Sequence, residues 1–118
     1  MYHRITDEGE FEPGSNASGQ KVTQSLVARL YGVPMDDLFA ATRRGARAAF
    51  ARQVAMYLMR VVYRLSLKEI GLAFGRDRST ASHACQLVEE LREDPAIDRQ
   101  LAQLENLLRG AAESETAQ

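Results

Sequence analysis

The segment from Ser66 to Leu91 constrains the fold more than any other part of this chain. Ser66 is followed three residues later by Glu69, the S-x-x-E spacing of a capping box, in which each side chain satisfies the other residue's backbone N–H. This pattern predicts a short helix from Leu67 to Phe74 that Gly75 ends. The polar string RDRS follows, and a second helix is expected to begin near Ser79. A short helix, a tight turn and a longer helix are the parts of a helix-turn-helix.

The rest of the chain also indicates helices, so the predicted fold is an all-α bundle. Apolar residues recur at helical spacing from Val22 to Leu30, with Gly32 as a C-terminal cap, and again from about Ala48 to Leu65. The stretch VPMDDLFA between them predicts a turn of helix that carries Leu38 and Phe39 into the core. The helix after Ser79 is predicted to bury one side, which consists of Thr80, Ala84, Leu87, Val88 and Leu91. A last helix is predicted to carry an apolar stripe of Ile97, Leu101, Leu104, Leu107 and Leu108.

These patterns place one folded domain at residues 20–109, between two flexible tails. Residues 1–19 are acidic and end in a turn-rich stretch, and residues 110–118 are polar without a periodic apolar pattern. The N-terminus lacks the apolar core of a secretory signal, and no apolar run reaches the ~20 residues of a membrane span. A single cysteine, Cys85, excludes an intrachain disulfide. We therefore expect a cytoplasmic protein that makes no contact with a membrane.

Charge is distributed unevenly, although the net charge is only −1. Residues 41–83 hold nine basic and two acidic residues, a net charge of +7, whereas residues 1–40 carry −3 and residues 84–118 carry −5. A basic middle region attracts phosphate, so duplex DNA is a candidate partner, against the alternative of an arginine-rich solvated face. The second helix of a helix-turn-helix enters the major groove with its N-terminal residues first.

Other chemistry has little support in the residues. His83 and Cys85 form an H-x-C pair, but two ligands without a further Cys or His cluster are too few for a structural zinc site. A solvated acidic helix end, rather than a catalytic pair, is the interpretation of Glu89, Glu90, Glu93 and Asp94. We expect no metal, no cofactor and no catalytic residue.

The run from Ala51 to Cys85, ARQVAMYLMRVVYRLSLKEIGLAFGRDRSTASHAC, resembles the C-terminal DNA-binding domain of the bacterial chromosomal replication initiator DnaA. The resemblance lies in RQVAMYL, in SLKEIGLAF and in GRDRSTASHAC, and it extends weakly over about residues 20–108. It implies a DNA-binding protein of the bacterial nucleoid. The initiator's ATPase of the AAA+ class has no counterpart here, because the chain contains no G-x-x-x-x-G-K-[ST] motif. We therefore expect a stand-alone domain that binds no nucleotide and is not an enzyme.

The resemblance also implies a set of DNA-binding residues. A basic loop arginine would enter the minor groove, an Arg-Gln pair and a lysine would contact phosphate, and the start of the second motif helix would read bases. The residues predicted to bind DNA are Arg43, Arg44, Arg47, Arg52, Gln53, Lys68, Arg76, Asp77, Arg78, Ser79, Thr80 and His83. Two departures affect readout: the family's paired glycine is the single Gly75, and its base-reading histidine is Arg78, a residue that pairs best with guanine.

Two functions follow from this resemblance. The first is duplex DNA binding that regulates replication initiation or transcription from initiator-like sites. The second is a protein-interaction module that imitates the initiator toward replication-initiation proteins, with DNA binding secondary. In the second case the acidic C-terminal helices would offer the partner surface.

Overall fold

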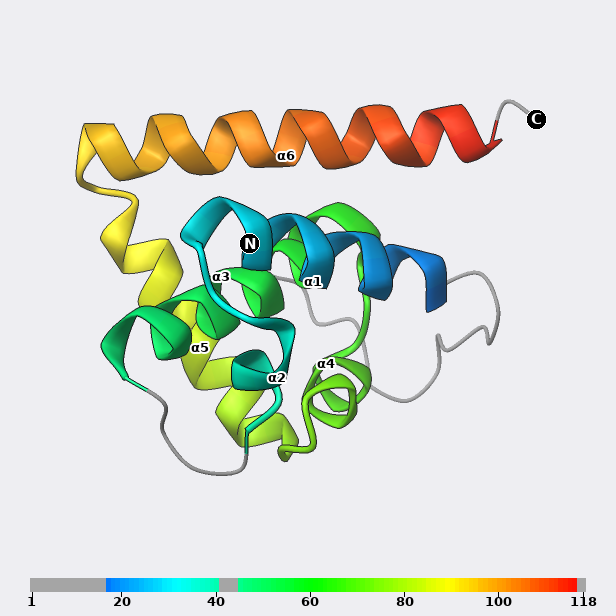
Figure 1. Cartoon of the computed structure of the whole chain (residues 1–118). Coiled ribbons are helices and arrows are strands. Elements are labelled where there is room, and N and C mark those ends of the chain that lie inside the picture. Colours follow the sequence, from blue (N-terminus) through cyan, green and yellow to red (C-terminus); the bar gives the residue numbers. More distant parts are fainter. Residues whose placement is uncertain (1–16, 41–44, 117–118) are drawn as a thin grey trace.

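The computed structural model describes residues 17–40 and 45–116, and in these ranges it contains six helices and no strand (Figure 1). The all-α prediction is confirmed. The helices are α1 (Ala17–Tyr31), α2 (Met35–Leu38), α3 (Ala46–Tyr63), α4 (Leu67–Ala73), α5 (Arg78–Leu91) and α6 (Pro95–Thr116). The side chains of 17–18 and 112–116 are not described.

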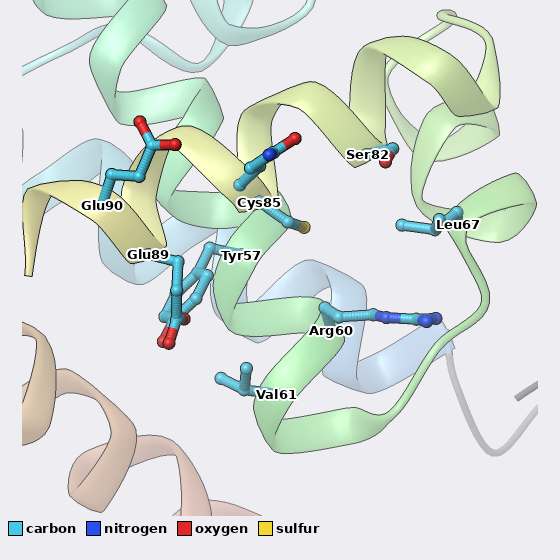
Figure 2. Close-up of a pocket in the computed structure, with 9 residues that line it drawn as sticks. Tyr57, Arg60, Val61, Leu67, Ser82, Cys85, Glu89 and Glu90 are labelled. Carbon is cyan, nitrogen blue, oxygen red and sulfur yellow. The ribbon is translucent and has the colours of Figure 1, made fainter. Parts of the chain in front are cut away.

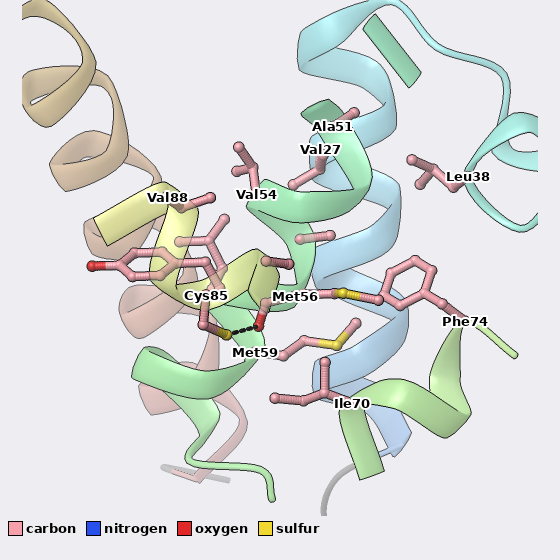
Figure 3. Packing of buried hydrophobic residues seen from close by; sticks show 14 of the residues in the cluster. Val27, Leu38, Ala51, Val54, Met56, Met59, Ile70, Phe74, Cys85 and Val88 are labelled. Atoms are coloured by element: carbon pink, nitrogen blue, oxygen red, sulfur yellow. Dashed lines mark hydrogen bonds between the residues drawn. The ribbon is translucent and has the colours of Figure 1, made fainter. Parts of the chain in front are cut away.

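Helix α3 is the centre of the molecule. Its six consecutive residues from Val54 to Met59 are all buried, which requires neighbours on every side of the helix. Val27 of α1, Ile70 of α4 and Val88 of α5 pack around it in one core (Figure 3). Because α4 and α5 both pack against α3, the central helix fixes how these two elements lie relative to each other.

Helix α5 buries a face that agrees only in part with the predicted one: Ala84 and Val88 are buried as predicted, whereas Leu87 and Leu91 are half-buried. Its buried residues are Ala81, Ala84, Cys85 and Val88, a regular i, i+3, i+4, i+7 stripe. Thr80, which the sequence placed on the buried side, is exposed, because its position lies in the first turn beside the capping residue. The two alanines and the cysteine are small, so α5 approaches α3 closely.

Phe39 was predicted to enter the core, but 39% of it is exposed. It follows the short helix α2 and lies on the surface, where its ring stacks on that of Phe74 at 5.4 Å between centroids. Leu38, its neighbour, is fully buried as predicted. Adjacent side chains on a helix point about 100° apart, so where a helix packs on one side only, one of the two can face the core while the other lies on the surface.

Helix α6 crosses the side of the molecule opposite α4 and the first turns of α5 (Figure 1). Asp94 caps it, accepting a hydrogen bond from the Ala96 amide at 2.9 Å. Its stripe buries Leu101, Leu104 and Leu108 but leaves Leu107 61% exposed, in contrast to the prediction. The helix continues to Thr116, beyond residue 109 where the sequence predicted the fold to end, and α1 begins before residue 20.

Arg92 fastens α6 to the bundle. Its Nε lies 2.6 Å from Asp98 Oδ1, and its Nη1 donates to Glu105 Oε2 and, at 3.0 Å, to the Tyr57 hydroxyl of α3. One side chain from the end of α5 therefore joins three helices. No helix in the described ranges combines the length and apolarity that crossing a membrane requires.

Candidate nucleic-acid interface

The capping box predicted at the start of α4 is confirmed. The Ser66 hydroxyl accepts a hydrogen bond from the Glu69 amide at 3.0 Å, and the Ser66 amide donates to Glu69 Oε1 at 2.9 Å. Both residues are buried, so these bonds satisfy polar groups that water does not reach. The box sets where α4 begins and therefore where the following turn lies.

The turn between α4 and α5 is packed against α4 without room for a side chain. Gly75 has φ +67°, a left-handed conformation that favours glycine. The Arg76 amide donates to the Gly71 carbonyl at 2.8 Å. A Cβ on Gly71 would lie 2.6 Å from the carbonyl oxygen of Arg76 and 2.7 Å from that of Asp77. Gly71 therefore permits the close helix–turn contact that sets the position of α5.

Asp77 caps α5. Its Oδ1 accepts hydrogen bonds from the Thr80 amide and from the Ser79 hydroxyl, each at 3.0 Å. The hydrogen bond from the Thr80 backbone is the main cause that lowers the pKa of this carboxyl. Asp77 thus orders the first turn of α5, where the sequence analysis placed the base-reading residues.

The outward face of α5 is polar along its whole length. Ser79, His83, Gln86 and Glu90 follow one another at i, i+4, i+7 and i+11, and all four are exposed. Arg78, Thr80 and Ser82 beside them are also exposed. This face lies opposite the stripe that packs on α3, so α5 presents a polar ridge to solvent.

The other predicted DNA-binding residues lie in different environments. Lys68 at the start of α4 and Arg47 at the start of α3 are exposed, and Gln53 is half-buried. Arg43 and Arg44 lie outside the described residues. The structure therefore brings Lys68 and the α5 residues into one helix-turn-helix, whereas Arg47 lies outside it, at the start of α3.

Arg52 is buried in the bundle, with 8% of its surface exposed. Its Nε donates to the Leu38 carbonyl at 2.8 Å and its Nη2 to the Asp37 carbonyl at 3.1 Å, so it holds α2 against α3. The resemblance implies that Arg52, in the Arg-Gln pair with Gln53, contacts phosphate. Its spacing from Ala48 and Ala55, four and three residues away on the buried face of α3, was the signal for an inward position.

Arg76 likewise binds backbone carbonyls. Its Nη1 donates to the Phe74 carbonyl at 2.9 Å and its Nη2 to the Ala40 carbonyl at 2.8 Å, and the side chain is half-buried. It therefore connects the helix-turn-helix turn to the segment after α2. Nothing in the sequence alone indicated this contact, because the two residues are 36 positions apart.

A groove of about 640 Å³ flanks α5, and the sequence analysis did not predict it (Figure 2). Its lining comes from α3, from the first residue of α4 and from α5, namely Tyr57, Arg60, Val61, Leu67, Ser82, Cys85, Gln86, Glu89 and Glu90. Because of this groove, one side of the polar face of α5 is open to solvent. Among the described residues no group of three or more His, Cys, Asp or Glu side chains could hold a metal ion.

The capped short helix, the glycine turn and the exposed polar helix together define a helix-turn-helix domain. Comparison with known families agrees: the family model described as the bacterial DnaA protein helix-turn-helix matches residues 21–88. This match covers more than half of the chain, and the chain belongs to the DnaA helix-turn-helix family.

Relatives and solved structures support the same assignment. The chain is 35% identical over 91 residues to the chromosomal replication initiator protein DnaA of Thermoanaerobacter sp. (strain X514), which covers 76% of this chain and 20% of that protein. It is 42% identical over 88 residues to the DnaA of Laribacter hongkongensis (strain HLHK9), covering 73% of this chain and 18% of that protein. The chain thus spans about a fifth of the length of these relatives.

Among solved structures, a replication initiator DnaA bound to AMPPCP and single-stranded DNA superposes with a TM-score of 0.72 at 31% identity. The match covers 82% of this chain and 30% of that chain. The structure of AMPPCP-bound DnaA from Aquifex aeolicus gives a TM-score of 0.72 at 30% identity, over 81% of this chain and 29% of that one.

Proposed function

We propose that this protein binds duplex DNA through α5 and thereby regulates the initiation of chromosome replication or transcription from initiator-like sites. The observation that carries the proposal is the exposed polar first turn of α5, which Asp77 caps and Gly71 holds close to α4. A helix presented in this way fits the major groove, where its N-terminal residues reach base edges. The +7 charge of residues 41–83 supplies attraction to phosphate.

Within this proposal the residues have different roles. Arg78, Ser79 and Thr80 contact base edges and nearby phosphates, with His83 one turn further along the same helix. Lys68 at the start of α4 and Arg47 at the start of α3 contact the DNA backbone, and Arg43 or Arg44 enters the minor groove. Arg52 and Arg76 act through their carbonyl contacts, by positioning α2 and the turn. The protein works on the bacterial chromosome in the cytoplasm and neither binds nor hydrolyses nucleotide.

The salt dependence of binding tests the DNA interaction. If about five basic residues meet phosphates, the logarithm of the association constant should fall with a slope near −4 to −5 against the logarithm of salt concentration. A single strand of the same length is the control, because the major groove exists only in the duplex. Absence of duplex binding at ~50 mM salt would overturn the proposal and favour the protein-interaction module.

The readout by Arg78 is tested against a randomised set of duplexes. Arginine donates two hydrogen bonds to guanine, an interaction that contributes ~1–3 kcal/mol to base discrimination. We expect Arg78→Ala to weaken preferred sequences most and to flatten the preference at one base pair. Lys68→Ala, the control, should weaken preferred and random duplexes alike and reduce the salt slope by about one. Identical profiles for the two variants would show that Arg78 does not read a base.

A further inference from the structure

The outward stripe of α5 changes its charge along the helix. Ser79, His83 and Gln86 occupy its first part, and Glu90 follows at the same face one turn later. At ~1.5 Å per residue, Glu90 lies about 16 Å along the axis from Ser79. Glu89 on the groove side and Glu93 just after the helix add two further exposed carboxylates. The helix that we propose to read DNA therefore ends in an acidic surface.

Two arginines near this end of α5, Arg92 and Arg60, bind other groups. Among the residues that the structure describes, ion pairs link Arg92 to Asp98 and to Glu105, both on α6. The arginine next in sequence to the acidic end is thereby committed to carboxylates other than Glu90. Arg60, across the groove, donates its Nη1 to the Leu65 carbonyl at 2.9 Å. The Glu90 carboxylate is exposed to solvent at the rim of the groove (Figure 2).

We infer that Glu90 is a specificity-determining residue that acts by repulsion. This inference rests on the proposed function. A carboxylate on the reading face repels the phosphates that border the major groove and keeps the C-terminal half of α5 away from the duplex. The DNA contact is then confined to the first two turns of α5, where Arg78, Ser79 and His83 lie. Specificity arises partly because unwanted contacts are penalised.

The repulsion affects random and preferred duplexes differently. On a preferred site the base contacts of the first turn fix α5 with its acidic end directed outward. On a random sequence those contacts are missing, and phosphate attraction alone leaves the helix able to lie along the groove. The charge of Glu90 opposes that second arrangement most. It therefore lowers non-specific binding more than specific binding.

The test compares two variants that raise the net charge by one unit each. Glu90→Gln removes the carboxylate from the outward face of α5, and Gln103→Lys adds a cation at an exposed position on a different helix, α6. Affinities are measured at ~50 mM salt for a duplex selected from a random pool and for a scrambled duplex. Thermal unfolding followed by circular dichroism checks that both variants remain folded.

We expect Glu90→Gln to tighten binding to the scrambled duplex about two- to threefold, because salt and water screen the repulsion between one carboxylate and the phosphates. The affinity for the selected duplex should change less. Glu90→Lys should enlarge the same difference, whereas Gln103→Lys should leave the ratio of the two affinities unchanged. Equal changes for Glu90→Gln and Gln103→Lys, or no change for Glu90→Gln, would overturn the inference while DNA binding stands. Failure of the unaltered protein to bind either duplex would instead overturn the proposed function.

Discussion

Three arginines within the segment from Ala51 to Cys85 have opposite environments, although all three were predicted to bind DNA. Arg78 is exposed at the first turn of α5, whereas Arg52 is buried and Arg76 is half-buried, and both of these bind backbone carbonyls. A guanidinium group suits either environment, because its planar fork of donors can bind a pair of carbonyls inside a protein as well as a phosphate outside it. Residue type therefore predicted that these side chains make polar contacts, but not whether each one faces solvent or binds carbonyls within the protein.

We expect Arg52→Ala to destabilise the fold by about 1–3 kcal/mol, because two carbonyls of α2 lose their buried donor. The measurement is urea unfolding, with Arg47→Ala as the control, since Arg47 is exposed on the same helix. DNA binding should weaken without a change in the salt slope. A slope shallower by about one unit at unchanged stability would instead show that Arg52 contacts phosphate.

At the scale of elements, helix boundaries were predictable and helix faces less so. The capping box at Ser66, the glycine ends at Gly32 and Gly75 and the helical opening at Pro95 are local signals, and all four lie at helix ends in the structure. The buried face of α5 was predicted only in part: Ala84 and Val88 are buried, but Ala81 and Cys85 were missed, because alanine and cysteine carry a weaker apolar signal than leucine. Packing against α3, a long-range property, decided the face.

The contact between α4 and the turn predicts opposite effects for two glycine substitutions. Gly71→Ala should destabilise by about 1–3 kcal/mol, because its Cβ would meet backbone oxygens that cannot move without shifting α5. Gly110→Ala in α6 should stabilise by up to about 1 kcal/mol, because no atom lies within 4 Å of its Cβ and alanine favours a helix. Thermal unfolding measures both. Equal shifts for the two variants would contradict the close packing at Gly71.

At the scale of the whole molecule, the distribution of charge was visible in the sequence, whereas the long-range connections were not. The basic middle region forms the central helix and the helix-turn-helix, and the acidic C-terminal region forms the end of α5 and α6. The groove beside α5 and the contacts of Arg92 and Arg76 depend on residues brought together only by folding. Spacing along one helix could not reveal them.

The pH dependence of global stability follows from two buried acids. Burial raises the pKa of the Cys85 thiol from about 9 to about 11 and that of Tyr57 to about 12. Raised pKa values mean that folding favours the neutral forms, so their contribution is complete below about pH 9 and is lost as pH rises toward 11 and 12.

We therefore expect the free energy of unfolding, measured in urea, to fall between pH 9 and pH 11, by about 1–3 kcal/mol from the thiol alone. Cys85→Ala should be less stable at neutral pH but should show a shallower decline above pH 9. A free energy of unfolding that stays constant up to pH 11 would contradict the raised pKa values.

The burial of α3 on all sides predicts slow hydrogen exchange of its backbone amides. Amide hydrogens between Val54 and Met59 lie in the centre of the core that these helices share, so they should exchange with solvent only when the whole domain opens. Helix α5 packs directly on α3. If α5 binds DNA as we propose, its orientation is set before DNA arrives, and docking orders exposed side chains of α5 rather than its backbone, which limits the entropy lost on association.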